Sequence, residues 1–180
     1  GAEVPCLRPK EISKNNSPEL DFVKHMLKYL HKNESYTPDI VVRMMATIPL
    51  QSTNDIDSVI EILFNNKEAD SAVVISEARQ HPKKALKIIE DNKGSKTLVS
   101  YFSESGREVT GIARQSYEKA YFRGNIIAVR FPIIFKTNSL TGDLVKYHII
   151  PQERSIDIDN EIDFFICEQL MNNHKNNLIT

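Results

Sequence analysis

The chain has 180 residues, of which 41% are hydrophobic and 26% charged, and its formal net charge is −1 at pH 7. This length and hydrophobic content suffice for one domain with its own core. Acidic and basic residues are interspersed, which excludes the basic face typical of a nucleic-acid-binding protein. No apolar run is long enough to cross a bilayer, and the first residues lack a signal-peptide pattern.

Cysteine usage indicates the compartment. The two cysteines, Cys6 and Cys167, lie near opposite ends of the chain and have no local partner. This arrangement fits a reducing environment better than a disulfide framework. We therefore expect a cytoplasmic protein whose partners include neither nucleic acid nor a membrane.

The first third of the chain predicts helix, strand and helix in turn. A helix should start at Ser17-Pro18-Glu19, because a capping hydroxyl precedes proline and an acid follows. Residues 40–45 form a short β-branched run typical of a strand covered on both faces, and Thr53 or Asn54 should open the next helix. The apolar positions of the two helices recur at three- and four-residue steps: Phe22, Val23, Met26, Leu27 and Leu30, then Ile56, Val59, Ile60, Leu63 and Phe64.

A second apolar strand is predicted at residues 71–75. Strand, helix and strand in this order indicate a βαβ crossover and a parallel sheet. Ligands of open α/β sheets lie beyond the carboxyl ends of the strands. The loops at residues 46–53 and 76–82 are therefore expected to line a site.

The pattern changes between residues 83 and 150. Short strand-like runs at residues 85–89, 97–102 and 145–150 are separated by turn signals, and part of this region is predicted to be an antiparallel insertion. Residues 124–130 are expected to return to the main sheet, followed by a short helix from Pro132. The last helix is predicted over residues 160–173, with these side chains inward: Ile162, Phe165, Ile166 and Leu170.

The usual nucleotide-binding loops are missing. Neither G-x-x-x-x-G-K-[ST] nor G-x-G-x-x-G occurs, and six glycines leave little from which to build a phosphate-binding loop. His81 lies in a loop after a predicted strand, where a structural histidine is as good an interpretation as a functional one.

Two carboxylates lie ahead of the last helix. In an extended backbone, Asp157 and Asp159 point to one side, with Ile156 and Ile158 on the other. Such a pair suits Mg²⁺, which takes one or two carboxylates together with waters and substrate phosphates. The alternative is that Asp159 or Asn160 caps the following helix while Asp157 is solvated.

Three segments together resemble one enzyme family. They are Glu-Arg-Ser-Ile-Asp-Ile-Asp at residues 153–159, Gly-Ala-Glu-Val-Pro with Arg-Pro at residues 1–9, and the strand and proline-bearing loop at residues 39–51. They are similar to segments of the acylneuraminate cytidylyltransferases, also called CMP-sialic acid synthetases. The resemblance implies a three-layer, Rossmann-like α/β fold with a mostly parallel sheet.

The resemblance also implies a set of site residues. Asp157 and Asp159 would hold the catalytic Mg²⁺, with Mn²⁺ as an alternative, and the nucleotide CTP would contact Arg8, Ala46, Thr47 and Pro49. The sugar acid would be bound by these residues: Arg79, Gln80, His81, Arg123, Gly124 and Asn125.

Some positions depart from the family pattern. Ile48 and Gln51 stand where the family has serine and arginine beside CTP, and Gln80 replaces the first histidine of a His-His-Pro sequence. Changes near the sugar indicate a different nonulosonic acid, such as legionaminic or pseudaminic acid. The family's first strand, its glycine-rich loop and a further βα unit have no counterpart here, which amounts to about 60 residues at about 30 per βαβ unit. We therefore expect these 180 residues alone to bind CTP poorly or not at all.

The sequence therefore predicts one cytidylyltransferase-like domain over residues 1–180, with a dimerisation insertion at about residues 100–150. The expected reaction transfers CMP from CTP to the anomeric 2-hydroxyl of a nine-carbon 2-keto sugar acid and releases pyrophosphate. The expected assembly is a homodimer. The alternative is a non-catalytic, truncated relative that keeps the fold as a dimerising module.

Overall fold

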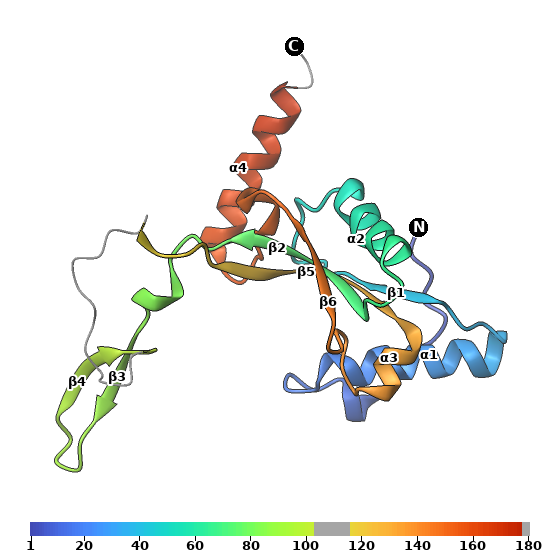
Figure 1. Cartoon of the computed structure of the whole chain (residues 1–180), viewed down its shortest axis with the longest axis horizontal. Helices are drawn as coiled ribbons and strands as arrows, with labels where there is room; N and C mark the ends of the chain where they lie inside the picture. Colours follow the sequence, from blue (N-terminus) through green and yellow to red (C-terminus); the bar gives the residue numbers. More distant parts are fainter. Residues whose placement is uncertain (103–115, 178–180) are drawn as a thin grey trace.

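The centre of the molecule is a four-stranded sheet with the strand order β1-β5-β2-β6. The computed structural model describes residues 1–102 and 116–177. Strands β2 and β6 are parallel, whereas β5 is antiparallel to both β1 and β2. Three strands therefore share one direction and β5 runs against them (Figure 1). The strands are β1 (Ile40–Arg43), β2 (Ser71–Glu77), β5 (Tyr121–Arg130) and β6 (Val145–Ile149).

Helices cover both faces of this sheet. Helix α2 (Thr53–Asn65) packs on one face, whereas α1 (Glu19–Glu34) and α3 (Phe131–Lys136) pack on the other. This three-layer arrangement confirms the predicted α/β class. Strands β1 and β2 run in the same direction, as the predicted βαβ crossover requires. The antiparallel β5 lies between them, so the sheet is mixed and not, as expected, parallel.

Strand β5 shows how its sequence builds the two layers. Ile126 and Ala128 are fully buried in the cluster under α2, while Ile127 and Val129 are buried under α1 and α3. Alternate side chains of a strand point to opposite faces, so an unbroken apolar run is buried on both sides. The run at the end of β5 therefore identifies it as a central strand.

The start of α2 is fixed by a capping box. The Ser52 hydroxyl accepts from the Asp55 N–H at 3.2 Å, and the Asp55 carboxylate accepts from the Ser52 N–H at 3.3 Å. These reciprocal bonds satisfy two amides that the first turn leaves unpaired. Ser52 is the cap residue, and the helix begins at Thr53, one of the two starting residues predicted from the sequence.

The cap predicted for α1 is wrong by one residue. Pro18 is the N-cap residue and makes no side-chain cap, whereas the Ser17 hydroxyl accepts from the Lys14 N–H at 3.0 Å. Ser17 therefore closes the turn before the helix. The predicted α1 stripe is confirmed in that Val23 and Leu27 are its buried residues. In α2, however, Phe64 is 67% exposed, contrary to expectation.

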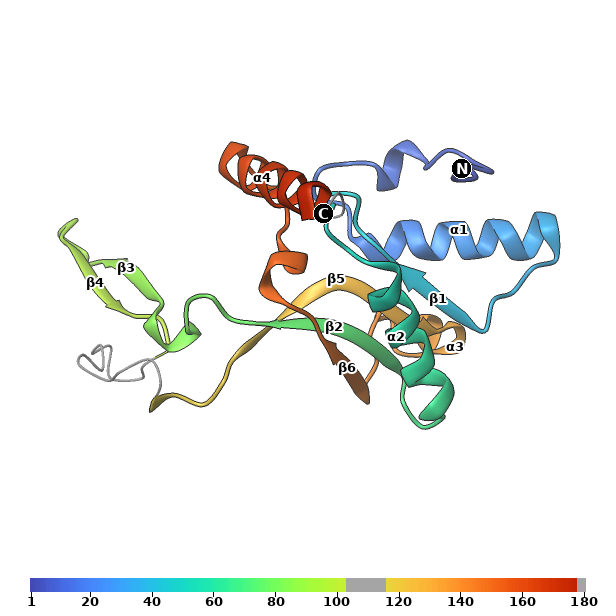
Figure 2. The same cartoon turned by 90° about the horizontal axis from the view of Figure 1, so that it is seen from above.

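A two-stranded antiparallel hairpin lies apart from the main sheet. Its strands are β3 (Leu86–Glu90) and β4 (Lys96–Ser100), and both views show it extending away from the helices (Figures 1 and 2). Strand β5 pairs in the main sheet, as predicted for residues 124–130. Strand β6 also pairs there, although it falls within the range predicted for the insertion. Residues 103–115 of that predicted range lie outside the described residues.

Helix α4 (Glu161–Asn177) closes the described chain. The inward side predicted for it is wrong at Ile162 and Phe165, which are 71% and 60% exposed. Cys167 is its buried residue. Short 3-10 turns occupy Lys10–Ile12, Pro82–Lys84 and Gln152–Ser155.

Within residues 1–102 and 116–177, no helix combines the length and the apolar character that a bilayer crossing needs.

Candidate active site

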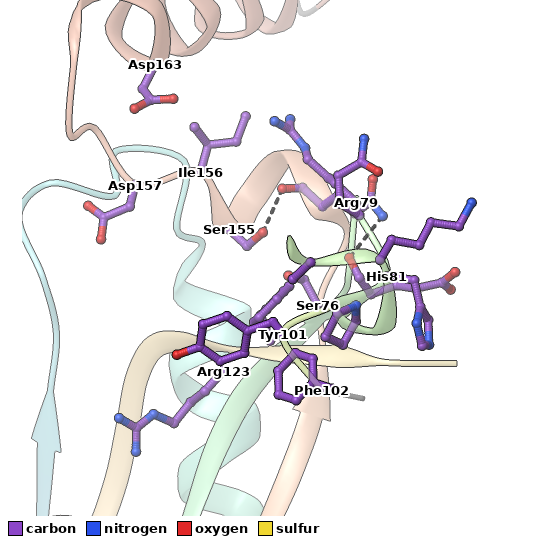
Figure 3. A pocket seen from close by; sticks show the side chains of 17 residues that line it. Ser76, Arg79, His81, Tyr101, Phe102, Arg123, Ser155, Ile156, Asp157 and Asp163 are labelled. Carbon is purple, nitrogen blue, oxygen red and sulfur yellow. Dashed lines mark hydrogen bonds between the residues drawn. The ribbon is translucent and has the colours of Figure 1, made fainter. Parts of the chain in front are cut away.

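A cavity of about 870 Å³ lies beyond the carboxyl ends of β2 and β6, at the base of the β3–β4 hairpin. This is the edge of the sheet at which the sequence predicts a ligand site. Figure 3 shows Asp157 and Asp163 at the end nearer to α4, with the rings of His81, Tyr101 and Phe102 at the opposite end. The other lining residues include Ser76, Glu77, Arg79, Gln80, Lys84, Phe122, Arg123, Gln152, Ser155 and Ile156.

Asp157 has one carboxylate oxygen bound and one free. Its Oδ2 accepts from Asn125 Nδ2 at 2.8 Å. Its Oδ1 is buried and has no hydrogen-bond partner among the described residues. A buried carboxylate oxygen left unpaired is costly, and a cation or a ligand donor would remove that cost. The chemistry of this atom therefore fits a hard divalent cation.

The protein alone supplies few further metal ligands here. In the part of the chain that the structure describes, no three His, Cys, Asp or Glu side chains are grouped so that they could hold a metal ion. Mg²⁺ commonly takes one or two carboxylates and completes its coordination with waters and substrate phosphates. The donor set at Asp157 thus suits a metal that arrives with a phosphorylated substrate.

Asp159 and its neighbours start helix α4. Asn160 Oδ1 accepts from the N–H groups of Ile162 and Asp163 at 2.9 and 3.1 Å, so Asn160 is the cap. The Asp159 N–H donates to Asp163 Oδ2 at 3.3 Å. The Asp159 side chain is exposed and does not line the cavity, whereas Asp163 does. The structure therefore brings Asp157 and Asp163 to one cavity, and the metal role of Asp159 stays a prediction.

Two exposed arginines, Arg79 and Arg123, line the cavity with Asp157, as does the exposed Gln80. Arg79 and Gln80 follow β2, and Arg123 lies on β5, so the antiparallel pairing brings distant parts of the sequence together. Guanidinium groups bind carboxylates in a bidentate manner. The cavity thus combines a free carboxylate oxygen with two cations suited to an acidic ligand.

His81 is already engaged by the backbone. Its Nδ1 accepts from the Lys83 N–H at 3.3 Å, and its Nε2 lies 3.0 Å from the Glu118 carbonyl, to which it donates. The ring also stacks on Tyr117, with centroids 4.7 Å apart. Both nitrogens therefore fix the loop after β2, and His81 presents a ring to the cavity.

Gly124 has a packing role. It is buried, and a Cβ at this position would lie 2.6 Å from Val74 Cγ2. The pairing register of β2 and β5 shifts between Val73 and Ile75, at the same place. Gly124 does not line the cavity, so its predicted contact with the sugar acid stays a prediction.

The predicted nucleotide contacts lie at two places. The Thr47 carbonyl accepts from the Ile158 N–H at 3.0 Å, which ties the loop after β1, including Ala46, to the segment that carries Asp157. Pro49 lines a groove against α4. Arg8 instead lies over the Phe22 ring at 4.1 Å and lines a separate cavity of about 470 Å³.

A polar network around the buried Asp55 lies next to the site. Asp55 is fully buried, and its Oδ1 lies 3.0 Å from Arg154 Nη2 and 3.4 Å from His148 Nε2. Arg154 directly precedes the Ser155-Ile156-Asp157 segment. Sequence reasoning missed this network, although the spacing of Ser52 and Asp55 was a readable capping-box signal.

The sequence is 25% identical over 172 residues to "post-translational flagellin modification protein B" of Campylobacter coli, a match that spans 95% of this chain and 69% of that protein. No family model matches the chain. The fold is similar to a solved CMP:2-keto-3-deoxy-manno-octonic acid synthetase complexed with CTP, with a TM-score of 0.54 and 10% identity over 89% of this chain and 70% of that one. The chain therefore shares the α/β fold of that synthetase, which is the fold class that its sequence resemblance predicts.

Proposed function

We propose that this chain belongs to an enzyme that transfers CMP from CTP to the anomeric 2-hydroxyl of a nine-carbon 2-keto sugar acid and releases pyrophosphate. The sugar acid would be of the sialic, legionaminic or pseudaminic type. The observation that carries the proposal is that Asp157, whose Oδ1 is buried and unpaired, lines the same cavity as Arg79 and Arg123. The fold similarity to a synthetase complexed with CTP supports the nucleotide.

Asp157 would hold the metal, together with Asp159 if the resemblance extends to that residue. A bound Mg²⁺ or Mn²⁺ would offset negative charge on the phosphate oxygens of CTP and on the leaving pyrophosphate. The residues of this chain would then contribute by holding the metal in position. Asn125 already occupies Asp157 Oδ2, so the remaining Oδ1 is the atom available for coordination.

The arginines would bind the other substrate. Arg79 and Arg123 suit the carboxylate of a 2-keto acid, and Gln80 can bond to its hydroxyls. Tyr101, Phe102 and Phe122 provide an apolar wall against which the body of a large sugar can pack. Holding the two reactants side by side is the main source of rate acceleration in such a transfer.

The Campylobacter relative is named for flagellin modification. This name supports a product that serves as the activated sugar donor for a protein modification. The alternative, a non-catalytic dimerising module, gives no reason to keep an unpaired buried carboxylate oxygen, because an apolar replacement would be more stable.

The test is a substrate panel. The purified natural protein would be incubated with Mg²⁺, CTP and each of four acids: sialic, legionaminic and pseudaminic acid, and the eight-carbon 2-keto-3-deoxyoctonic acid. We expect pyrophosphate release and a CMP-sugar with a nine-carbon acid, and no product with ATP in place of CTP. Turnover with the eight-carbon acid alone would overturn the substrate assignment, and no CMP-sugar with any acid would overturn the proposal.

A further inference from the structure

A chain of hydrogen bonds runs from α1 through the sheet to Asp157. Arg43, at the end of β1, forms a two-point ion pair with Glu19 on α1 through its Nε and Nη2 atoms. Its Nη1 donates to Asn125 twice, to the backbone carbonyl at 3.1 Å and to the side-chain Oδ1 at 3.4 Å. Asn125 Nδ2 then donates to Asp157 Oδ2 at 2.8 Å.

The donors and acceptors along this series of hydrogen bonds determine the orientation of the Asn125 amide. A guanidinium can only donate, so the atom of the Asn125 amide that faces Arg43 must be its oxygen. The amide nitrogen must then face Asp157, where it donates to a carboxylate that can only accept when ionised. A flipped amide would set its N–H₂ against Arg43 and its oxygen against Asp157, with two unfavourable contacts.

The burial of Arg43 makes this orientation firm. The side chains of Arg43 and Glu19 are 12% and 28% exposed, so the guanidinium is held between an acid and an amide with little access to water. Hydrogen bonds that involve charged groups are stronger than neutral ones, and more so away from bulk water. Arg43 therefore sets the Asn125 amide before any ligand binds.

This arrangement affects the two carboxylate oxygens of Asp157 differently. One donor occupies Oδ2 and leaves Oδ1 buried without a partner. The hydrogen bond from Asn125 restricts rotation of the Asp157 carboxylate, so its two oxygens do not exchange places freely. Residues that hydrogen-bond a metal-ligating carboxylate orient it, and replacing such residues typically weakens metal binding by about 10- to 100-fold.

We propose that Asn125 and Arg43 are positioning residues that hold Asp157 with Oδ1 directed to a divalent cation. This inference rests on the proposed function, because it deepens the role given there to Asp157. It also gives Asn125 a role other than the sugar contact predicted from sequence. Arg43 carried no functional prediction, and a lysine at its position could not form the same fork.

The test measures binding of Mn²⁺ alone to the natural protein, by electron paramagnetic resonance of the free ion, so that no turnover is needed. The Asp157→Asn variant shows how much of the Mn²⁺ binding depends on Asp157. Asn125→Leu keeps the size and removes the donor, and we expect it to weaken Mn²⁺ binding about tenfold or more. Arg43→Lys keeps the charge but not the fork, and we expect a loss of roughly threefold, because the amide can then rotate.

Ser52→Ala is the matched control. It removes the α2 cap and so destabilises the fold, but it touches neither Asn125 nor Arg43, and Mn²⁺ binding should stay unchanged. Thermal melts would compare the stabilities of all variants. Asp157-dependent binding that Asn125→Leu leaves unchanged, or weakens no more than Ser52→Ala does, would overturn the positioning role alone. Absence of any Asp157-dependent binding in the unsubstituted protein would overturn both this inference and the metal site of the proposed function.

Discussion

At the scale of single residues, Asp70 closes a turn by accepting two backbone donors. Its Oδ2 accepts from the N–H groups of Asp143 and Leu144 at 2.7 and 3.0 Å. These two bonds lower the pKa of Asp70, the Leu144 bond most, because they favour the ionised carboxylate. Gly142 lies in the same turn with φ at +68°, and a Cβ there would lie 2.7 Å from the Asp70 carboxylate.

This pKa gives a prediction for acid stability. The folded-state pKa of Asp70 is depressed, so its stabilising contribution is present above the pKa of the unfolded chain and is lost as the pH falls through the folded value. Asp70→Asn should lower the free energy of unfolding by about 1 kcal/mol at pH 7, since the group is near the surface.

Urea unfolding at several pH values measures this difference. It should shrink as the pH falls below about 4, where the carboxylate of the unfolded chain becomes protonated, and it should vanish as the pH falls through the lower folded-state pKa. Asp57→Asn, a change of an exposed carboxylate on α2, is the control and should have little effect. If the loss of unfolding free energy caused by Asp70→Asn is the same at every pH, the charge of Asp70 does not contribute to stability.

At the scale of elements, the Asp55–Arg154 pair joins the start of α2 to the turn that precedes Asp157. Removing Asp55 leaves Arg154 without its counterpart, at a cost of roughly 2 kcal/mol, because Asp55 is buried but the Arg154 side chain is 34% exposed. We expect this loss for Asp55→Asn, measured by chemical denaturation.

A double-variant cycle isolates the pair. Arg154→Met should also destabilise, and the double variant should be more stable than the sum of the single losses predicts, because no charge is then left unpaired. Strict additivity of the two losses would show that the ion pair contributes nothing as a pair.

The sequence was sufficient to predict elements whose burial follows a local rule. The stripe of α1 and the apolar run of β5 were predictable because periodicity reports which side of an element is covered. Helix α4 was not, since its apolar residues satisfy the helical period while Ile162 and Phe165 remain exposed. Periodicity indicates that a helix has an apolar side, but it does not indicate which element packs against that side.

The candidate site was predictable only in part, for a related reason. The loop after β2 and Asp157 could be identified from position and resemblance, and both line the cavity. The links through Arg43, Asn125 and Asp55 could not, because they join residues on separate elements. Such contacts depend on the strand order, and the antiparallel β5 between β1 and β2 was not predicted.

At the scale of the whole molecule, the hairpin exposes apolar side chains. Ile88 and Leu98 pair across β3 and β4 and are 69% and 60% exposed. The resemblance predicts a homodimer through the inserted β region, which begins in sequence where this hairpin ends. Exposed apolar patches of this kind are typical of interaction surfaces.

Charge introduced into the hairpin tests this prediction. The double variant Ile88→Asp/Leu98→Asp should shift a dimer to monomers in sedimentation equilibrium, because buried carboxylates are costly at an interface. The thermal midpoint of the main domain at high dilution should stay the same, as the hairpin forms its own sheet. A dimer that survives both charges would place the interface elsewhere.

The proposed reaction depends on Oδ1 of Asp157, a residue that lines the cavity at the end of β2 and β6. The most direct measurement compares CMP-sugar formation by the natural protein and its Asp157→Asn variant across a range of Mg²⁺ concentrations. We predict a loss of at least about 100-fold in turnover that added Mg²⁺ does not restore, with an unchanged melting profile. Equal turnover by the two proteins would contradict the account.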